Sequence, residues 1–205
     1  MLTLARLTLA LVALAAIGWQ LVLHVGASYS VLNFFSYFTN LSNLFAVLVL
    51  LLSVVSGGSA RDLARYLSAV NMAVVGIVFA VLLRDVDLGA LRPWVNVVLH
   101  IVMPVAVVLD WLLRPPTAAL TAKHVRLALV FPALYLVYVL VRGAATGWYP
   151  YPFLDPAHVG GYGVVAAYAV GIFATFLLAS WALLAVGNRS ARKTHAGVWK
   201  ARGEA

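Results

Sequence analysis

The chain has 205 residues, of which 64% are hydrophobic and 10% are charged, and its mean hydropathy is +1.01. So much apolar surface in so short a chain excludes an ordinary soluble domain and predicts a protein that lies in a lipid bilayer. The formal net charge of +8 does not indicate a nucleic-acid partner, because the Lys and Arg residues lie between and after the apolar runs.

Six apolar runs follow one another along the chain, each close to the ~20 residues that a helix needs to cross a bilayer. We predict transmembrane helices over residues 4–24, 34–55, 66–83, 94–113, 126–142 and 161–186. A β-barrel does not fit, because barrel strands alternate apolar and polar residues and these runs are continuously apolar. The predicted fold class is therefore all-α: a six-helix transmembrane bundle over residues 1–187, with a basic tail over residues 188–205.

The basic residues predict the orientation of this bundle. Eleven of the 14 Lys and Arg residues lie on the side of the two termini, and Arg84, Arg92 and Arg142 lie on the other side. The positive-inside rule then predicts a multi-pass protein of the cell (plasma or inner) membrane with both termini and a frayed tail in the cytoplasm. The first run also has features of a cleaved signal peptide, and its removal would leave the other five spans in the same orientation.

A polar segment opens the second run, at residues 37–43. Thr39, Ser42, Asn43 and Ala46 share one helix face, with Asn40 beside them, and we expect this small, polar stripe to face the interior of the bundle. Ser, Thr and Asn also cap helices and hold neighbouring helices together, so a purely structural role stays open.

The fourth run carries a second polar face, formed by Asn96, His100, Val107 and Asp110. His100 is an ionisable side chain within a span, which indicates either a function or a hydrogen-bonded packing residue. Asp110 lies near the predicted cytoplasmic end, where we expect it to be solvated or paired with Arg114.

Helix geometry brings these two faces to the same depth. Thr39 and His100 lie five and six residues inside the same boundary, or roughly 8–9 Å at ~1.5 Å per residue. A Thr hydroxyl beside an imidazole that burial keeps uncharged can act as a nucleophile and its base. The two residues are therefore candidates for a catalytic pair.

An aromatic, proline-rich loop over residues 148–154 precedes the sixth run. It contains Trp148, Tyr151 and Phe153, and it can form either a lid over a pocket or a plug in the end of the bundle. Tyr135 and Tyr138 in the fifth run either line the same cavity or pack in an ordinary core. The chain has no cysteine, no P-loop, no H-E-x-x-H and no acidic cluster, so we expect no cofactor and no metal.

Three segments together resemble the androgen-induced-gene family of membrane proteins. They are Y-F-T-N-L-S-N at 37–43, the N-x-x-x-H pair of Asn96 and His100, and W-Y-P-Y-P-F-L at 148–154. The resemblance implies an intramembrane threonine hydrolase that cleaves fatty acid esters of hydroxy fatty acids. It further implies Thr39 as nucleophile and His100 as base, with Asn96 orienting His100 or holding the oxyanion. The expected partners are membrane lipids and an acyl ester or other hydrophobic ligand in the helix bundle.

The residues alone also allow a non-catalytic protein, either a small-solute transporter or a lipid-binding or assembly factor. Few charges lie within the spans, and Asn and Ser suit helix packing. Thr39 and His100 more than about 10 Å apart, or without a cavity beside them, would favour this alternative. A pocket that opens to lipid and one that opens to the outer aqueous side are both compatible with the sequence.

Overall fold

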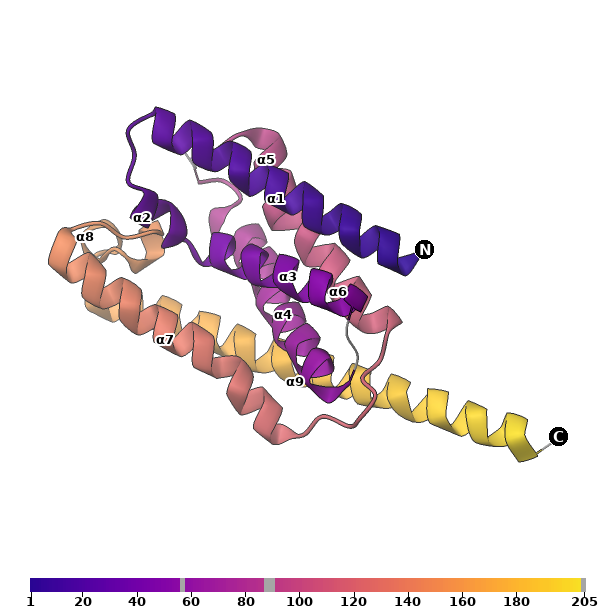
Figure 1. The fold of residues 1–205 in the computed structure, drawn as a ribbon. Coiled ribbons are helices and arrows are strands. Elements are labelled where there is room, and N and C mark those ends of the chain that lie inside the picture. Colours follow the sequence, from indigo (N-terminus) through magenta and orange to yellow (C-terminus); the bar gives the residue numbers. More distant parts are fainter. Residues whose placement is uncertain (56–57, 87–90, 204–205) are drawn as a thin grey trace.

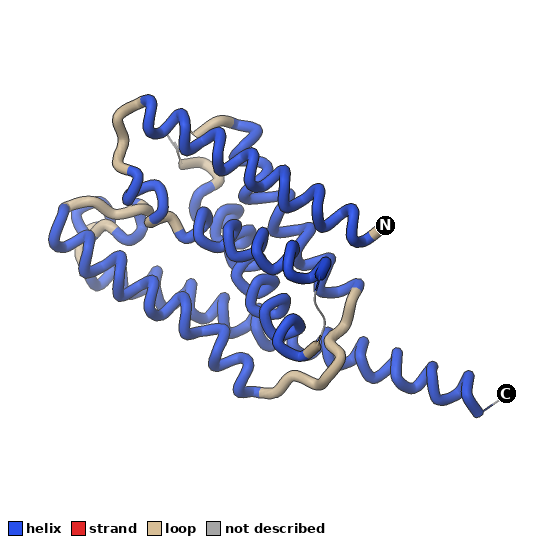
Figure 2. Tube along the Cα trace, in the orientation of Figure 1, coloured by secondary structure: helices blue, strands red, loops and turns tan. Residues whose placement is uncertain are grey.

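Six helices in this computed structural model are long and apolar enough to cross a membrane. The structure describes residues 1–55, 58–86 and 91–203, with side chains to Ala191. The six spans are α1 (Leu2–Gly26), α3 (Phe38–Val55), α4 with η1 (Ser59–Leu83), α5 to α6 (Pro93–Leu113), α7 (Ala122–Thr146) and Tyr162–Ala191 within α9 (Tyr162–Gly203). No strand occurs among the described residues (Figure 2), so the predicted six-helix, all-α fold is confirmed.

Shorter elements interrupt or connect the spans. α4 proper covers Ser59–Val78 and passes into a π-helix, η1 (Phe79–Leu83). The fourth span consists of α5 (Pro93–Val97), the π-helix η2 (Val98–Val102) and α6 (Met103–Leu113). Three small helices lie at one end of the bundle: α2 (Val31–Phe35), the 3-10 helix η3 (Pro152–Leu154) and α8 (Pro156–Val159). We call this the α8 end, and the opposite end, where both termini lie, the termini end (Figure 1).

Several predicted boundaries differ from the observed ones. The third span begins at Ser59 rather than at residue 66, and the fifth covers Ala122–Thr146 rather than residues 126–142. The second span begins at Phe38 rather than at residue 34, because the preceding apolar segment forms the separate helix α2. The hydroxyl of Ser36 donates to the Leu32 carbonyl at 2.7 Å where α2 ends. Beyond the sixth span, α9 continues as a helix to Gly203 instead of fraying at residue 188. The basic side chains expected there at positions 192, 193, 200 and 202 lie outside the described residues.

α4 lies at the centre of the bundle and packs against α3, α6 and α9 (Figure 1). α1 covers α3 through Ala10, Ala13 and Ala16, none of which is exposed. Small side chains allow the two helix backbones to approach closely, which is how helices associate in lipid. Large apolar side chains point outward, for example Leu178 at 71% exposure, as expected for a surface that faces acyl chains.

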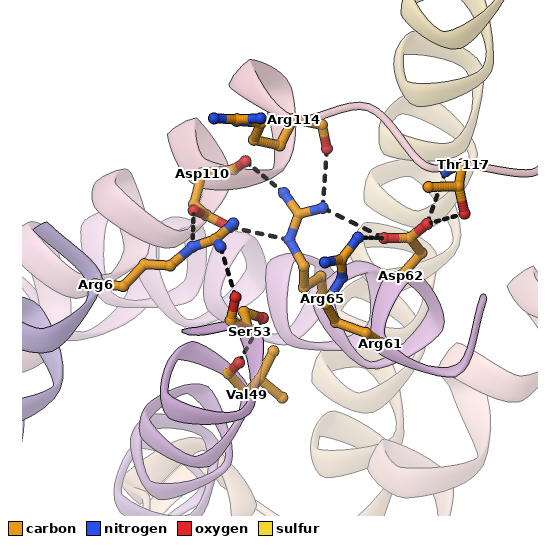
Figure 3. A network of polar contacts seen from close by, with 9 residues as sticks. All are labelled: Arg6, Val49, Ser53, Arg61, Asp62, Arg65, Asp110, Arg114 and Thr117. Carbon is orange, nitrogen blue, oxygen red and sulfur yellow. Dashed lines mark hydrogen bonds and ion pairs between the residues drawn. The ribbon is translucent and has the colours of Figure 1, made fainter. Parts of the chain in front are cut away.

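A buried network of ion pairs joins four segments at the termini end (Figure 3). Arg6 on α1 and Arg65 on α4 both contact the Asp110 carboxylate on α6, at 2.7 and 3.1 Å. Asp62, one turn before Arg65, accepts hydrogen bonds from the backbone and the hydroxyl of Thr117 at 2.7 and 2.6 Å. The network therefore ties α1, α4, α6 and the connection to α7 together.

The environment of Asp110 corrects the sequence-based expectation. Asp110 is only 7% exposed, and its carboxylate pairs with Arg6 and Arg65 rather than with Arg114, whose backbone carbonyl accepts from Arg65 instead. A buried carboxylate requires charged partners, and two arginines from neighbouring helices supply them. The pairing depends on which faces of α1 and α4 are turned toward α6, because these faces carry Arg6 and Arg65. The residues next to Asp110 in the sequence do not predict it.

Candidate active site

Thr39 lies in the first turn of α3, directly after the break that ends α2. Asn40, the next residue, donates its side-chain amide to the Phe34 carbonyl at 2.8 Å and so supports the chain across the break. The side chain of Thr39 points into the bundle and is 7% exposed. The broken helix thus presents a hydroxyl group to the interior near the α8 end.

His100 lies in the π-helix η2, where the backbone is wider than in an α-helix. Pro104 follows four residues later and has no N–H to donate to the His100 carbonyl, which accounts for the irregular turn. The imidazole stacks on the ring of Phe79, the first residue of η1, with centroids 4.5 Å apart. Two π-helical segments therefore meet at this histidine, and such segments are frequent at functional sites.

The Thr39 hydroxyl and the His100 ring are in contact. Thr39 Oγ1 lies 3.3 Å from His100 Nε2, and His100 Nδ1 lies 3.2 Å from the carbonyl oxygen of Asn96. A carbonyl oxygen only accepts, so its contact assigns the ring proton to Nδ1 and leaves the Nε2 lone pair facing Thr39. This is the tautomer that a general base for the Thr39 hydroxyl needs.

Asn96 acts through its backbone and not through its side chain. Its carbonyl orients His100, whereas its side-chain Oδ1 is buried without a hydrogen-bond partner among the described residues. Asn43 is the amide that joins the two helices: its Nδ2 donates to the Thr39 carbonyl at 2.9 Å and to the Leu99 carbonyl at 3.2 Å. Asn43 therefore sets the position of α3 relative to η2, directly behind the Thr39–His100 contact.

Tyr151 is the third polar side chain at Thr39. Its phenol oxygen accepts from the Thr39 backbone N–H at 3.3 Å and lies 3.4 Å from Thr39 Oγ1. Burial raises the pKa of Tyr151, so the phenol keeps its proton. The ring stacks parallel to Phe153 with centroids 5.1 Å apart. Tyr151 therefore brings a fixed hydrogen-bond donor to the threonine from the loop before α8.

Tyr135, Tyr138 and Trp148, the other aromatic candidates from the sequence, contact the neighbours of Thr39 rather than Thr39 itself. Tyr135 accepts from the Phe38 N–H at 3.1 Å and donates to the Ser36 carbonyl at 2.8 Å, while the Tyr138 hydroxyl contacts Ser36 Oγ at 2.8 Å. Both tyrosines thus brace the α2–α3 break rather than touch Thr39. Trp148 packs edge-on against Tyr37 with centroids 5.8 Å apart.

Two cavities meet at Thr39. The larger one, of about 650 Å³, lies at the α8 end and has a mixed polar lining; we call it the polar cavity. The smaller one, of about 70 Å³, is enclosed almost entirely by apolar side chains; we call it the apolar cavity. Thr39, Leu83 and Tyr151 line both cavities, whereas His100 lines the polar one.

Several of the polar and aromatic candidate residues from the sequence line one or both of these cavities. Asn40 and Trp148 line the polar cavity, together with Gln20, His24, Asn33 and His158. Tyr135 and Phe153 line the apolar cavity, together with Phe38, Leu136, Phe173 and Phe176. Tyr138 and Asn43 line neither of the two. Tyr151, Phe153 and Leu154 are all buried, so the loop before α8 is packed into the end of the bundle and forms part of both cavity walls.

Sequence reasoning missed two features of this site. It did not identify Phe79, which stacks on His100 from a different helix. It placed Tyr151 in a loop that forms a lid or a plug, without a contact to Thr39. Pro104, four residues after His100, is a sequence signal for the irregular turn; Phe79 has no comparable signal. Among the described residues no group of three His, Cys, Asp or Glu side chains could hold a metal ion.

The fold and the site together define a six-helix integral membrane protein with a buried Thr–His–Tyr cluster between an apolar and a polar cavity. Residues 77–183, just over half of the chain, match the FAR-17a/AIG1-like protein family, so the chain belongs to this family, the androgen-induced-gene family. The match includes His100 and Tyr151, and Thr39 precedes it. Comparison with curated proteins finds no match, and comparison with solved structures finds none either.

Proposed function

We propose that this protein is an intramembrane lipid-ester hydrolase in which Thr39 is the nucleophile and His100 the general base. The observation that carries the proposal is the 3.3 Å contact between Thr39 Oγ1 and His100 Nε2 at the junction of an apolar and a polar cavity. A nucleophile beside a base that a third group orients is the arrangement that covalent catalysis requires. The His100 Nδ1 contact with the Asn96 carbonyl supplies that third group.

The reaction follows from the positions of the polar atoms. Thr39 Oγ1 attacks the ester carbonyl carbon and transfers its proton to His100 Nε2, which forms an imidazolium. The tetrahedral intermediate collapses, the C–O bond to the alcohol breaks, and His100 returns the proton to the departing alcohol. Water from the polar cavity then attacks the acyl-threonine and gives a proton to His100. The bond between the acyl carbon and Thr39 Oγ1 breaks, His100 returns the proton to Oγ1, and the carboxylic acid leaves.

The Tyr151 hydroxyl would stabilise the negative charge that develops on the carbonyl oxygen. It lies within 3.4 Å of Thr39 Oγ1 and is held in place by stacking on Phe153. A donor that is already oriented loses little in reorganisation when the charge appears, which makes such donors effective. The Thr39 backbone N–H, which now donates to Tyr151, is the second donor at this position.

The two cavities suggest the class of substrate. An acyl chain suits the apolar cavity, while the polar cavity has room for the alcohol portion and for water. The family resemblance refines this class to fatty acid esters of hydroxy fatty acids, which contain one ester bond between two aliphatic portions. We propose further that both termini lie in the cytoplasm, that the polar cavity opens to the outer face, and that the protein resides in the cell membrane.

Labelling with a fluorophosphonate tests the proposal, because such reagents react with activated hydroxyl nucleophiles. We expect the purified protein to label, Thr39→Ala to abolish labelling, and Thr39→Ser to retain it. Thr8→Ala is the matched control, since Thr8 is an exposed threonine on α1 away from both cavities. Wild-type labelling in Thr39→Ala would remove Thr39 from the mechanism. An unlabelled, inactive wild type would favour the non-catalytic alternative.

A further inference from the structure

A third hollow lies on the side of the bundle, between η1 with the end of α4 and the first half of α9. It is an open groove of about 480 Å³ with an apolar lining, and we call it the α4–α9 groove. Ile77 and Val81 on its one side are 45% and 73% exposed, and Val164 on the other side is 40% exposed. All three residues belong to transmembrane spans, so in a membrane the groove faces acyl chains rather than water.

The groove and the apolar cavity share a wall. Val78 on α4 and Ile172 on α9 line both hollows, and each of these two side chains is half-buried. On its far side the apolar cavity ends at Thr39 and Tyr151, where the polar cavity begins. The groove and the apolar cavity therefore lie in a row from the lipid-facing side of the bundle to the Thr39 hydroxyl, with the side chains of Val78 and Ile172 between them.

We propose that the α4–α9 groove is the entrance through which the acyl chain of a membrane-dissolved ester reaches Thr39. The proposal rests on the hydrolase function and adds the route and the form of the substrate: a long-chain ester taken sideways from the bilayer. The apolar lining of the groove and the cavity matches an aliphatic chain along its length, and Thr39 lies where the apolar lining gives way to the polar one. A short, water-soluble ester has a second route through the polar cavity.

Gly171 offers a position at which to close the groove. It lines the groove on α9, and a Cβ atom built there meets no heavy atom within 4 Å. A Cβ atom is therefore accommodated at this position without a shift of its neighbours, and we expect a phenylalanine side chain there to obstruct the groove. Gly18 on α1 is a matched control, because it is also an exposed helical glycine with open space around its Cβ position, and it lines none of the three hollows.

The experiment compares wild type, Gly171→Phe and Gly18→Phe as full-length proteins in lipid nanodiscs. We expect Gly171→Phe to slow the hydrolysis of a long-chain ester dissolved in the bilayer about tenfold or more, with hydrolysis of a water-soluble acetate ester within about twofold of wild type. Gly18→Phe should match wild type for both substrates. Equal losses for the two esters in Gly171→Phe, or no loss for the long-chain ester, would overturn the proposed route.

A second measurement keeps the entrance testable without catalysis. A long-chain fatty acid that carries a photoreactive diazirine should crosslink to peptides of α4–η1 and α9, and Gly171→Phe should remove these crosslinks. Val81→Trp, on the opposite side of the groove, gives an independent closing variant if Gly171→Phe does not fold. Crosslinks elsewhere, or crosslinks that survive both substitutions, would refute the entrance. A protein that crosslinks in the groove but hydrolyses no ester would instead refute the hydrolase function.

Discussion

Two polar side chains, those of His100 and Tyr151, contact the Thr39 hydroxyl, and the other hydrogen bonds of each decide what it can do there. His100 Nδ1 contacts a backbone carbonyl, so only its Nε2 is available to accept the Thr39 proton. Tyr151 contacts both the hydroxyl and the N–H of Thr39. Each of the three side chains thus has one assigned role, which makes single-atom substitutions informative.

Tyr151→Phe removes one hydroxyl group and keeps the ring that stacks on Phe153. We expect kcat to fall about 10²-fold with KM little changed, because the lost hydrogen bond strengthens only as charge develops on the substrate oxygen. Steady-state kinetics with one ester substrate measure both constants. Tyr138→Phe is the control, since the Tyr138 hydroxyl contacts Ser36 and not Thr39. A rise in KM with kcat unchanged, or an equal fall in kcat for Tyr151→Phe and Tyr138→Phe, would mean that the Tyr151 hydroxyl has only a packing role.

At the scale of elements, the packing of α3 against η2 brings Thr39 and His100 into contact. Thr39 and His100 lie on different helices, and the amide of Asn43 bridges the backbone carbonyls of Thr39 and Leu99. The polar residues at the start of α3 therefore have both of the roles that the sequence left open. Asn43 holds two helices together, and Thr39 faces the cavities.

Asn43→Leu should uncouple the two helices. We expect it to destabilise the protein by about 1–3 kcal/mol, because the Leu99 carbonyl loses a buried partner, and to lower ester hydrolysis more than stability alone explains. Asn188→Ala is the matched control: Asn188 bridges the N–H and the carbonyl of Leu120 at the termini end. Thermal unfolding in detergent and activity below the melting range give both quantities. Similar activity in both variants would contradict a positioning role for Asn43.

Some span ends were predictable to within a few residues, as at Val55 and Leu113. The start of the third span was not: α4 begins at Ser59 and not at residue 66, because Asp62 and Arg65 are buried within the helix. The break before Phe38 was not predictable, because α2 is almost as apolar as a span. Hydrogen bonds of Ser36 and Asn40, and of Tyr135 and Tyr138 on α7, hold the chain at this break. Helix rise predicted an equal depth for Thr39 and His100, but the count began at residue 34, which lies in α2; the contact itself comes from the packing of α3 against η2. The contact of Phe79 with His100 and the shapes of the cavities depend on packing between helices, which a single sequence does not encode locally.

At the scale of the whole molecule, the two ends of the bundle differ in kind. The α8 end holds the two cavities and their uncharged polar cluster, whereas the termini end is closed by the ion pairs of Arg6, Arg65 and Asp110 (Figure 3). Arg6 and Arg65 are 9% and 3% exposed, so water solvates their charges little and the Asp110 carboxylate must compensate them. The network therefore fixes the helices at one end, while the polar cavity and the Thr39–His100 contact lie toward the other.

Asp110→Asn should leave Arg6 without its carboxylate partner and Arg65 with Asp62 alone, whose carboxylate lies 3.6 Å from the Arg65 guanidinium. We expect the free energy of unfolding to fall by about 3–5 kcal/mol, because removal of one partner of a buried ion pair leaves a desolvated charge without compensation. Denaturant titration of the protein in detergent micelles measures this loss. Asp85→Asn is the control, because Asp85 is exposed and should change the stability little. Equal stability of the two variants would mean that the network does not hold the termini end together.

The central claim is that the Thr39 hydroxyl is the atom that reacts. Mass-spectrometric mapping of the fluorophosphonate adduct on the wild-type protein tests this claim most directly, because it identifies the modified residue without assuming a substrate. The account predicts an adduct on the peptide that contains Thr39, strongly reduced in His100→Gln, which lacks the base. An adduct on any other residue, or an unchanged yield in His100→Gln, would contradict it.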